Sequence, residues 1–303
     1  MTAPDYQTLI DAPTWEFIRR TEAAYPPDTA SRSIAEQRAI YDAMCATFRL
    51  PRPAGLRVED RRIGGVPCRV YDGTGPATVI WLHGGGYVVG GLDSHDEACA
   101  GLAHATGLRV IAVDYRLSPE HRHPAALEDA CAVIAATPGP LVLAGDSAGG
   151  NLAAAAAHRL RDPRILGQVL IYPGLGGDRS RGSYQTHAHA PMLTRADVEF
   201  YAGIRHGGVE PPPGDATVAP LQDTDFTRLP MTLAIAAECD PLADDAAEYA
   251  ARITAAGGRA HAVTERGLVH GYLRARSTVP RAADSFERIL AAVGAFAAGR
   301  WPF

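Results

Sequence analysis

Residues 141–151 read LVLAGDSAGGN, an apolar run that leads into a turn of small residues around one serine, Ser147. The run Leu141 to Ala144 is typical of a buried strand, and Asn151 to Leu160 is rich in helix-forming alanine. A serine in a sharp strand-to-helix turn needs small neighbours, and Gly145 and Gly149 leave that room. The stretch therefore predicts that Ser147 is a nucleophile at the carboxyl edge of a sheet, with a chance glycine-rich turn as the alternative.

Apolar runs of the same kind recur along the chain and alternate with helix-competent segments. The other runs are Thr78 to Leu82, Arg109 to Val113, Gln168 to Tyr172, Met231 to Ala237 and Arg259 to Thr264. The further helical segments are Ala125 to Ala136 and Asp244 to Ala256. Upstream, Leu56 to Ile63 and Val66 to Tyr71 flank Gly64-Gly65, which predicts an antiparallel hairpin. The alternation predicts an α/β fold with a mostly parallel central sheet and helices on both faces.

Two segments interrupt this alternation. Residues 1–50 are expected to form helices that end near Pro51, whereas residues 176–215 look irregular and contain Pro211-Pro212-Pro213. Both are candidates for a lid over the site. For the 303 residues we therefore expect a single domain, with a cap built from about 1–50 plus about 176–215.

Composition narrows the function classes. Hydrophobic residues make up 47% of the chain and charged residues 21%, as in globular proteins. The formal net charge of −5 provides no broad basic surface for phosphates or anionic lipids, so neither nucleic acid nor a membrane is an expected partner. The five cysteines are scattered without a C-x-x-C pair, and we expect them to be reduced. The chain lacks the features of a secretory signal and any apolar run of about 18 residues, which favours a cytoplasmic location.

A second glycine-rich motif, residues 83–86 (HGGG), follows the strand-like run Thr78 to Leu82. Consecutive glycines leave backbone N–H groups unshielded, so that these groups can converge on a carbonyl oxygen that is turning into an alkoxide. We expect the N–H groups of Gly85, Gly86 and Ala148 to form this oxyanion hole. The segment matches neither G-x-G-x-x-G nor the P-loop pattern, which disfavours nucleotide binding.

A serine hydroxyl needs a base to remove its proton, and the chain has 11 histidines from which to choose. In sites of this type the order along the chain is serine, acid, histidine. Asp240 comes just after the run Met231 to Ala237, and His270 follows the next run across a short loop, which favours Asp240 as the acid and His270 as the base. Glu238, Asp244 and Asp245 are alternatives for the acid, and His261 is an alternative for the base.

Two histidine pairs, His121 with His123 and His187 with His189, have a spacing that a strand could present to zinc. Neither pair has an evident third ligand. We therefore expect no metal.

Taken together, these motifs resemble the hormone-sensitive-lipase-like bacterial esterases, the family IV carboxylesterases of the α/β-hydrolase superfamily. The resemblance rests on residues 83–87 (HGGGY), 114–121 (DYRLSPEH), 145–151 (GDSAGGN), 240–242 (DPL) and 270–271 (HG), in that order. It implies a helical cap, no cofactor, a possible homodimer, and hydrolysis of small-molecule, short-chain acyl esters through an acyl-enzyme intermediate. Two rivals remain: an amidase or deformylase with the same triad, and a non-catalytic ligand-binding protein on a hydrolase scaffold, like the plant gibberellin receptors.

Overall fold

An eight-stranded sheet organises the protein in the computed structural model, which describes residues 4–303. The strands are β1 (Val58–Ile63), β2 (Val66–Tyr71), β3 (Thr78–Leu82), β4 (Arg109–Val113), β5 (Leu141–Asp146), β6 (Ile165–Ile171), β7 (Met231–Cys239) and β8 (Ala260–Val269). They lie in the order β1-β2-β4-β3-β5-β6-β7-β8, and of these eight strands β2 alone runs opposite to the others. This arrangement confirms the predicted mostly parallel sheet.

The predicted hairpin is present at one edge of the sheet. Gly64 and Gly65 connect β1 to β2 with φ values of +58° and +84°, and the flanking residues Ile63 and Val66 pair across the turn. Two successive positive φ angles suit a tight hairpin turn and favour glycine at both positions.

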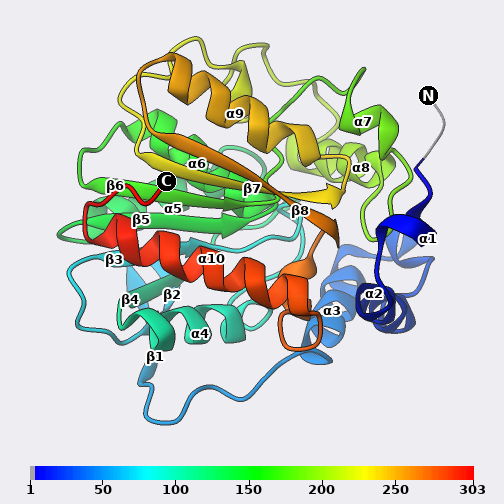
Figure 1. The fold of residues 1–303 in the computed structure, drawn as a ribbon, viewed down its shortest axis with the longest axis horizontal. Helices are drawn as coiled ribbons and strands as arrows, with labels where there is room; N and C mark the ends of the chain where they lie inside the picture. Colours follow the sequence, from blue (N-terminus) through cyan, green and yellow to red (C-terminus); the bar gives the residue numbers. More distant parts are fainter. Residues whose placement is uncertain (1–3) are drawn as a thin grey trace.

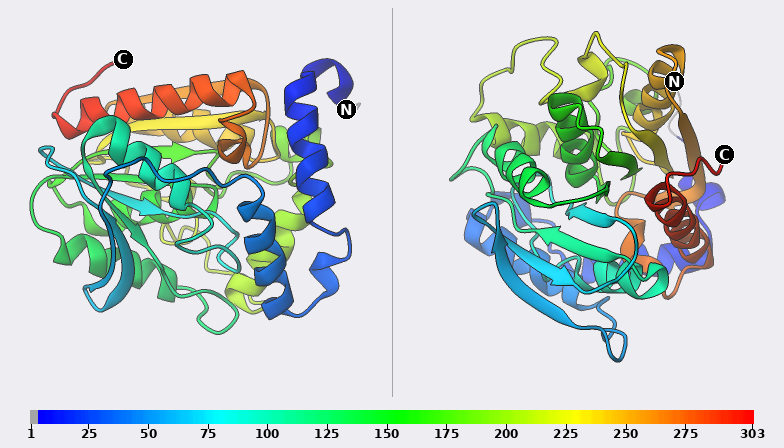
Figure 2. Two further views of the ribbon diagram at one scale, coloured as in Figure 1. Left: turned by 90° about the horizontal axis from the view of Figure 1, so that it is seen from below. Right: turned by 90° about the vertical axis from the view of Figure 1, so that its left-hand side faces the viewer.

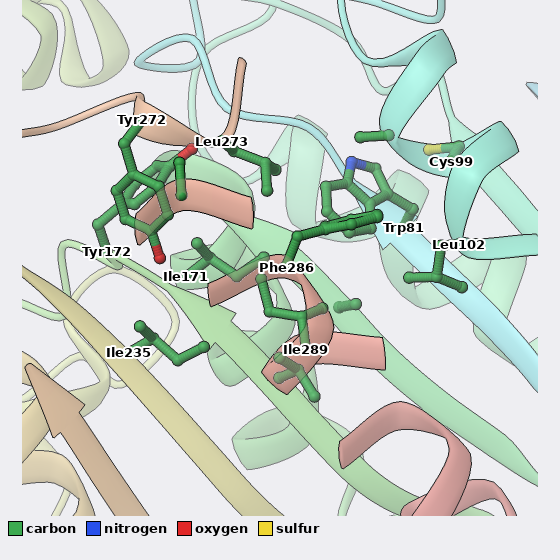
Figure 3. Packing of buried hydrophobic residues seen from close by; sticks show 14 of the residues in the cluster. Trp81, Cys99, Leu102, Ile171, Tyr172, Ile235, Tyr272, Leu273, Phe286 and Ile289 are labelled. Carbon is green, nitrogen blue, oxygen red and sulfur yellow. The ribbon is translucent and has the colours of Figure 1, made fainter. Parts of the chain in front are cut away.

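Helices cover both faces of the sheet (Figure 1). One layer consists of α4 (Asp96–Thr106) and α10 (Pro280–Ala297), and the other of α5 (Ala125–Ala136), α6 (Ala148–Leu160) and α9 (Ala243–Ala255). Because side chains alternate along a strand, β3 contributes Val79 and Trp81 to the first layer and Ile80 and Leu82 to the second. Figure 3 shows the first layer, where the indole of Trp81 lies among buried side chains of α4 and α10.

One strand boundary differs from the prediction. Strand β8 continues to Val269 instead of ending near Thr264, so that His270 follows the strand directly and not across a short loop. Two residues of this extension have tertiary partners: Glu265 forms an ion pair with Arg288, and the Gly267 N–H donates to Glu238. The strand therefore continues beyond the run Arg259 to Thr264 that the sequence indicates.

The two segments that interrupt the alternation lie at the same end of the sheet (Figure 2). The N-terminal segment, whose residues 1–3 lie outside the described part, forms α1 (Tyr6–Leu9), α2 (Ala12–Ala24), the 3₁₀ turn η1 (Thr29–Ser31) and α3 (Ile34–Ala46). The other contains α7 (Ser183–Thr186) and α8 (Arg195–His206), with the 3₁₀ turn η2 (Pro220–Gln222) just beyond it.

The expectation of irregular structure is wrong for α8. Its first turn carries a capping box, in which the Thr194 hydroxyl accepts the Asp197 N–H and the Asp197 carboxylate accepts the Thr194 N–H. Such a reciprocal cap stabilises a helix start. None of the helices formed by residues 4–303 has the length and apolar character needed to cross a membrane.

Candidate active site

Ser147 occupies a strained turn between β5 and α6. Its φ and ψ are +53° and −119°, a combination that non-glycine residues rarely adopt. The turn fits closely against β3, because a Cβ atom on Gly149 would lie 1.9 Å from the carbonyl oxygen of Leu82. The backbone N–H of Ser147 donates to Ile171 at 2.8 Å, which ties the turn to the end of β6. The small residues are therefore required by packing, as the sequence indicates.

Three side chains from different strand ends meet at this turn. His270 lies with Nε2 2.8 Å from the Ser147 hydroxyl oxygen and with Nδ1 2.6 Å from Oδ2 of Asp240. The Asp240 carboxylate is fully buried, and its Oδ1 accepts the N–H of Leu242 at 2.9 Å. A carboxylate at Nδ1 favours the tautomer with its proton on that nitrogen, which leaves Nε2 free to accept a proton from serine.

The alternatives considered for acid and base occupy other places. Glu238 accepts the Gly267 N–H, Asp244 the Ser183 N–H and Asp245 the Leu175 N–H, while His261 stacks on Phe303 with ring centroids 4.4 Å apart. None of these four residues is hydrogen-bonded to Ser147 or His270 within the described chain.

The glycine loop after β3 faces the same space. Gly85 and Gly86 have φ values of +126° and +59°, and a Cβ on Gly85 would lie 2.1 Å from the Val89 carbonyl oxygen. Gly85, Gly86 and Ala148 all line the cavity that also contains Ser147 and His270. Within residues 4–303, no intramolecular hydrogen bond occupies the N–H groups of these three residues.

A buried aspartate, to which the sequence analysis assigned no role, connects the loop to the serine turn. Asp146 accepts the Gly84 N–H at 2.9 Å and also contacts His95 Nε2 at 3.1 Å and the Tyr172 hydroxyl at 3.3 Å. Burial acts to raise the pKa of this carboxyl, but His95, Arg274 and the Gly84 N–H outweigh it and lower the pKa to about 2. Asp146 is thus an anion that holds the Gly84 loop beside Ser147. In the sequence, only its position directly before Ser147 indicated that Asp146 belongs to the site.

The paired histidines have other contacts. His123 Nε2 lies 3.2 Å from the Thr217 hydroxyl, and His187 Nδ1 lies 3.1 Å from the Tyr6 hydroxyl. Residues 4–303 contain no group of three or more His, Cys, Asp or Glu side chains that could hold a metal ion. The cysteines Cys45, Cys68, Cys99, Cys131 and Cys239 are all unbridged.

A cavity of about 1480 Å³ extends from Ser147 between the two interrupting segments. Its walls include Tyr25 and Tyr41 from the N-terminal segment and Tyr201 from α8. Segments distant in the sequence therefore form a shared wall of the space above the serine.

Comparisons with known proteins agree with this geometry. A family model described as alpha/beta hydrolase fold matches residues 79–274. Carboxylesterase NlhH of Mycobacterium tuberculosis is 37% identical over 268 residues, which cover 78% of this chain and 82% of that protein. Ethyl acetate hydrolase of Pseudomonas putida is 33% identical, with 72% of each chain covered.

Solved structures give the same result. An esterase from the bacterial hormone-sensitive lipase family superposes with a TM-score of 0.84 at 27% identity, covering 94% of this chain and 98% of that one. The hyperthermophilic esterase of Pyrobaculum calidifontis superposes with a TM-score of 0.84 at 30% identity, covering 95% and 99%.

Proposed function

Since this chain belongs to the α/β-hydrolase-fold family of carboxylic ester hydrolases related to hormone-sensitive lipase, we propose that Ser147, His270 and Asp240 are its catalytic triad. The observation that carries the proposal is the continuous chain of contacts from Ser147 through both nitrogens of His270 to Asp240, at 2.8 Å and 2.6 Å. Nucleophilic catalysis accounts for a serine in a strained turn that contacts a histidine oriented by a buried carboxylate.

In the proposed reaction, His270 Nε2 removes the Ser147 proton while Oγ attacks the ester carbonyl. The N–H groups of Gly85, Gly86 and Ala148 stabilise the oxyanion, which is worth several kcal/mol in such sites. His270 then gives its proton to the leaving alcohol, and water displaces the acyl group from Ser147 by the same route. The residues that take part need neither a metal ion nor a cofactor.

The substrates are proposed to be soluble esters with about two to six acyl carbons. The names of relatives support the short end of this range, since these relatives include an ethyl acetate hydrolase and acetyl esterases. We propose that residues 1–50 and 176–215 act as the cap that limits the acyl pocket. Amide hydrolysis has less support, because the named relatives above are esterases. The homodimer and the cytoplasmic location stay predictions.

The test is Ser147→Ala, with p-nitrophenyl butyrate as substrate. Turnover should fall by about 10⁴- to 10⁶-fold while the protein remains folded, because only binding and the oxyanion hole remain. A fluorophosphonate should label the wild type at Ser147 and leave the variant unlabelled. The exposed Ser277 provides the matched control, and Ser277→Ala should keep full activity. A folded Ser147→Ala variant that retains more than about a hundredth of the activity would disprove the assignment.

A further inference from the structure

Arg274 places a positive charge next to the proposed catalytic histidine. It lies on the 3₁₀ turn η3 (Tyr272–Ala275), just after His270, and lines the same cavity as Ser147. Its Nη2 atom is 2.6 Å from the position that a Cβ on Gly271 would occupy. The guanidinium group is therefore adjacent to the reacting residues without being one of them.

This charge has no carboxylate partner, unlike those of comparable arginines. The side chains of Arg69, Arg161 and Arg276 are 12%, 14% and 9% exposed, and each has a carboxylate oxygen within 4.0 Å. Arg205, which also lines the cavity, packs over the Tyr87 ring at 3.8 Å and donates to the carbonyl oxygens of residues 217 and 218. Arg205 also lacks a carboxylate partner, but two backbone carbonyl oxygens accept hydrogen bonds from it, whereas none in the described chain accepts one from Arg274.

The contacts of Arg274 are few. Among residues 4–303, its only hydrogen bond is a long one, 3.3 Å from Nη1 to the Tyr41 hydroxyl. Its Nε is buried without a partner, and no carboxylate oxygen comes within ion-pair distance of it in the described chain. A covered guanidinium with so few acceptors is unfavourable unless something else provides them.

The groups around Arg274 do not place a negative charge in direct contact with its guanidinium. Burial raises the pKa of the Tyr41 and Tyr172 hydroxyls and of the Cys45 thiol, so all three are neutral at physiological pH. Asp146 is the nearby anion and attracts Arg274 from a distance, since Arg274 helps to lower its pKa, but its oxygens contact Gly84, His95 and Tyr172 and not the guanidinium. A ligand anion in the cavity would therefore give Arg274 the direct carboxylate contact that the described chain does not provide.

We propose that Arg274 binds a carboxylate on the substrate, and that the preferred substrates are half-esters of short dicarboxylic acids. This inference rests on the proposed function and specifies its substrate class. A planar guanidinium suits a carboxylate. We place this carboxylate on the acyl part of the substrate, because the acyl part stays at Ser147 through both steps of the reaction. Ser147 displaces the alcohol, which leaves with the proton from His270, and water then releases the dicarboxylate product.

The experiment compares half-esters with neutral esters of the same length. Ethanol release is measured for the monoethyl esters of succinate, glutarate and adipate and for ethyl butyrate, pentanoate and hexanoate. In the wild type, at least one half-ester should exceed its neutral analogue in kcat/KM by about tenfold or more, the value of one charge-assisted hydrogen bond. Arg274→Gln should abolish this preference, because kcat/KM should fall about tenfold further for the half-esters than for the neutral esters, chiefly through KM. Arg274→Lys should restore part of the preference because it keeps the charge.

The controls separate this inference from its alternatives. Arg266→Gln removes the same charge from an exposed position and should keep the preference. In a measurement that needs no variant, glutarate or adipate should inhibit wild-type turnover of ethyl butyrate competitively and more strongly than pentanoate or hexanoate.

Three results would overturn the proposal: no half-ester preference in the wild type, equal loss on both substrate series in Arg274→Gln, or no selective inhibition by the dicarboxylates. Equal loss would mean that Arg274 acts on the structure or on the oxyanion. If the wild type hydrolysed no ester at all, the proposed function would fail instead.

Discussion

Asp240→Asn is the sharpest test of how the proposed base is oriented. Asparagine has nearly the same shape as aspartate, and its amide oxygen can still accept the Leu242 N–H in place of Oδ1. The amide NH₂ then faces His270 Nδ1 at the position of Oδ2, which is 2.6 Å away. Two N–H groups cannot face each other at that distance, so the imidazole moves its proton to Nε2 and can no longer accept one from Ser147.

The expected loss in kcat is about 10⁴-fold, as in other serine triads, or about 5.5 kcal/mol of transition-state stabilisation. The assay is kcat and KM for p-nitrophenyl butyrate, with thermal unfolding as the check on folding. KM should change little, because substrate does not contact the buried residue 240. Asp244→Asn is the matched control, since Asp244 accepts the Ser183 N–H away from the triad. If the folded Asp240→Asn variant turned over within about tenfold of wild type, Asp240 would not orient the base.

The remaining predictions concern the histidines and metal dependence. His270→Ala should reduce turnover about as severely as Ser147→Ala. His261→Ala should leave turnover near wild type, because the His261 ring stacks on Phe303. The reverse result would make His261 the base. Burial and the neighbouring His95 lower the pKa of His83 to about 4 from 6.5, so the unfolded chain binds this proton first as pH falls. As the pH falls from 6.5 to 4, His83 should therefore lower the free energy of unfolding by about 3 kcal/mol. In chemical denaturation, the free energy of unfolding of His83→Gln should depend less on pH than that of the wild type. An equal pH dependence would contradict a buried neutral His83. Exhaustive treatment with a metal chelator should leave esterase activity intact, and inhibition that zinc reverses would assign a role to the paired histidines.

The sequence predicted most of the fold because local pattern and tertiary environment agree over most strands. The runs Thr78 to Leu82 and Arg109 to Val113 match β3 and β4 residue for residue, since central strands that are buried on both faces are apolar after their first residue here. The triad candidates follow from the turn residues around Ser147 and from positions after strands, which the topology brings to one edge of the sheet.

Of the features that the sequence missed, the end of β8 and the isolation of Arg274 depend on residues that are distant along the chain, whereas the start of α8 depends on a local pattern. In the extension of β8, Arg288 forms an ion pair with Glu265 and Glu238 accepts the Gly267 N–H, and no local pattern reveals these partners. The helix α8 could have been found from Thr194 and Asp197, whose spacing is that of a capping box. The isolation of Arg274 is visible only in three dimensions, because it consists of the absence of acceptors around one side chain in the described structure.

The Asp146 carboxylate joins the loop after β3 to the turn after β5, and this link bears on how the enzyme could be re-engineered. The proposed nucleophile and the proposed oxyanion donors lie on two segments that Asp146 connects, whereas walls of the cavity come from α3 and α8, outside these segments. Exchanging residues 176–215 with those of another esterase should therefore change which acyl groups are accepted while the rate of the chemical step on a small acetate ester is retained. Under this proposal, substitutions in the cap would change selectivity without altering the catalytic residues.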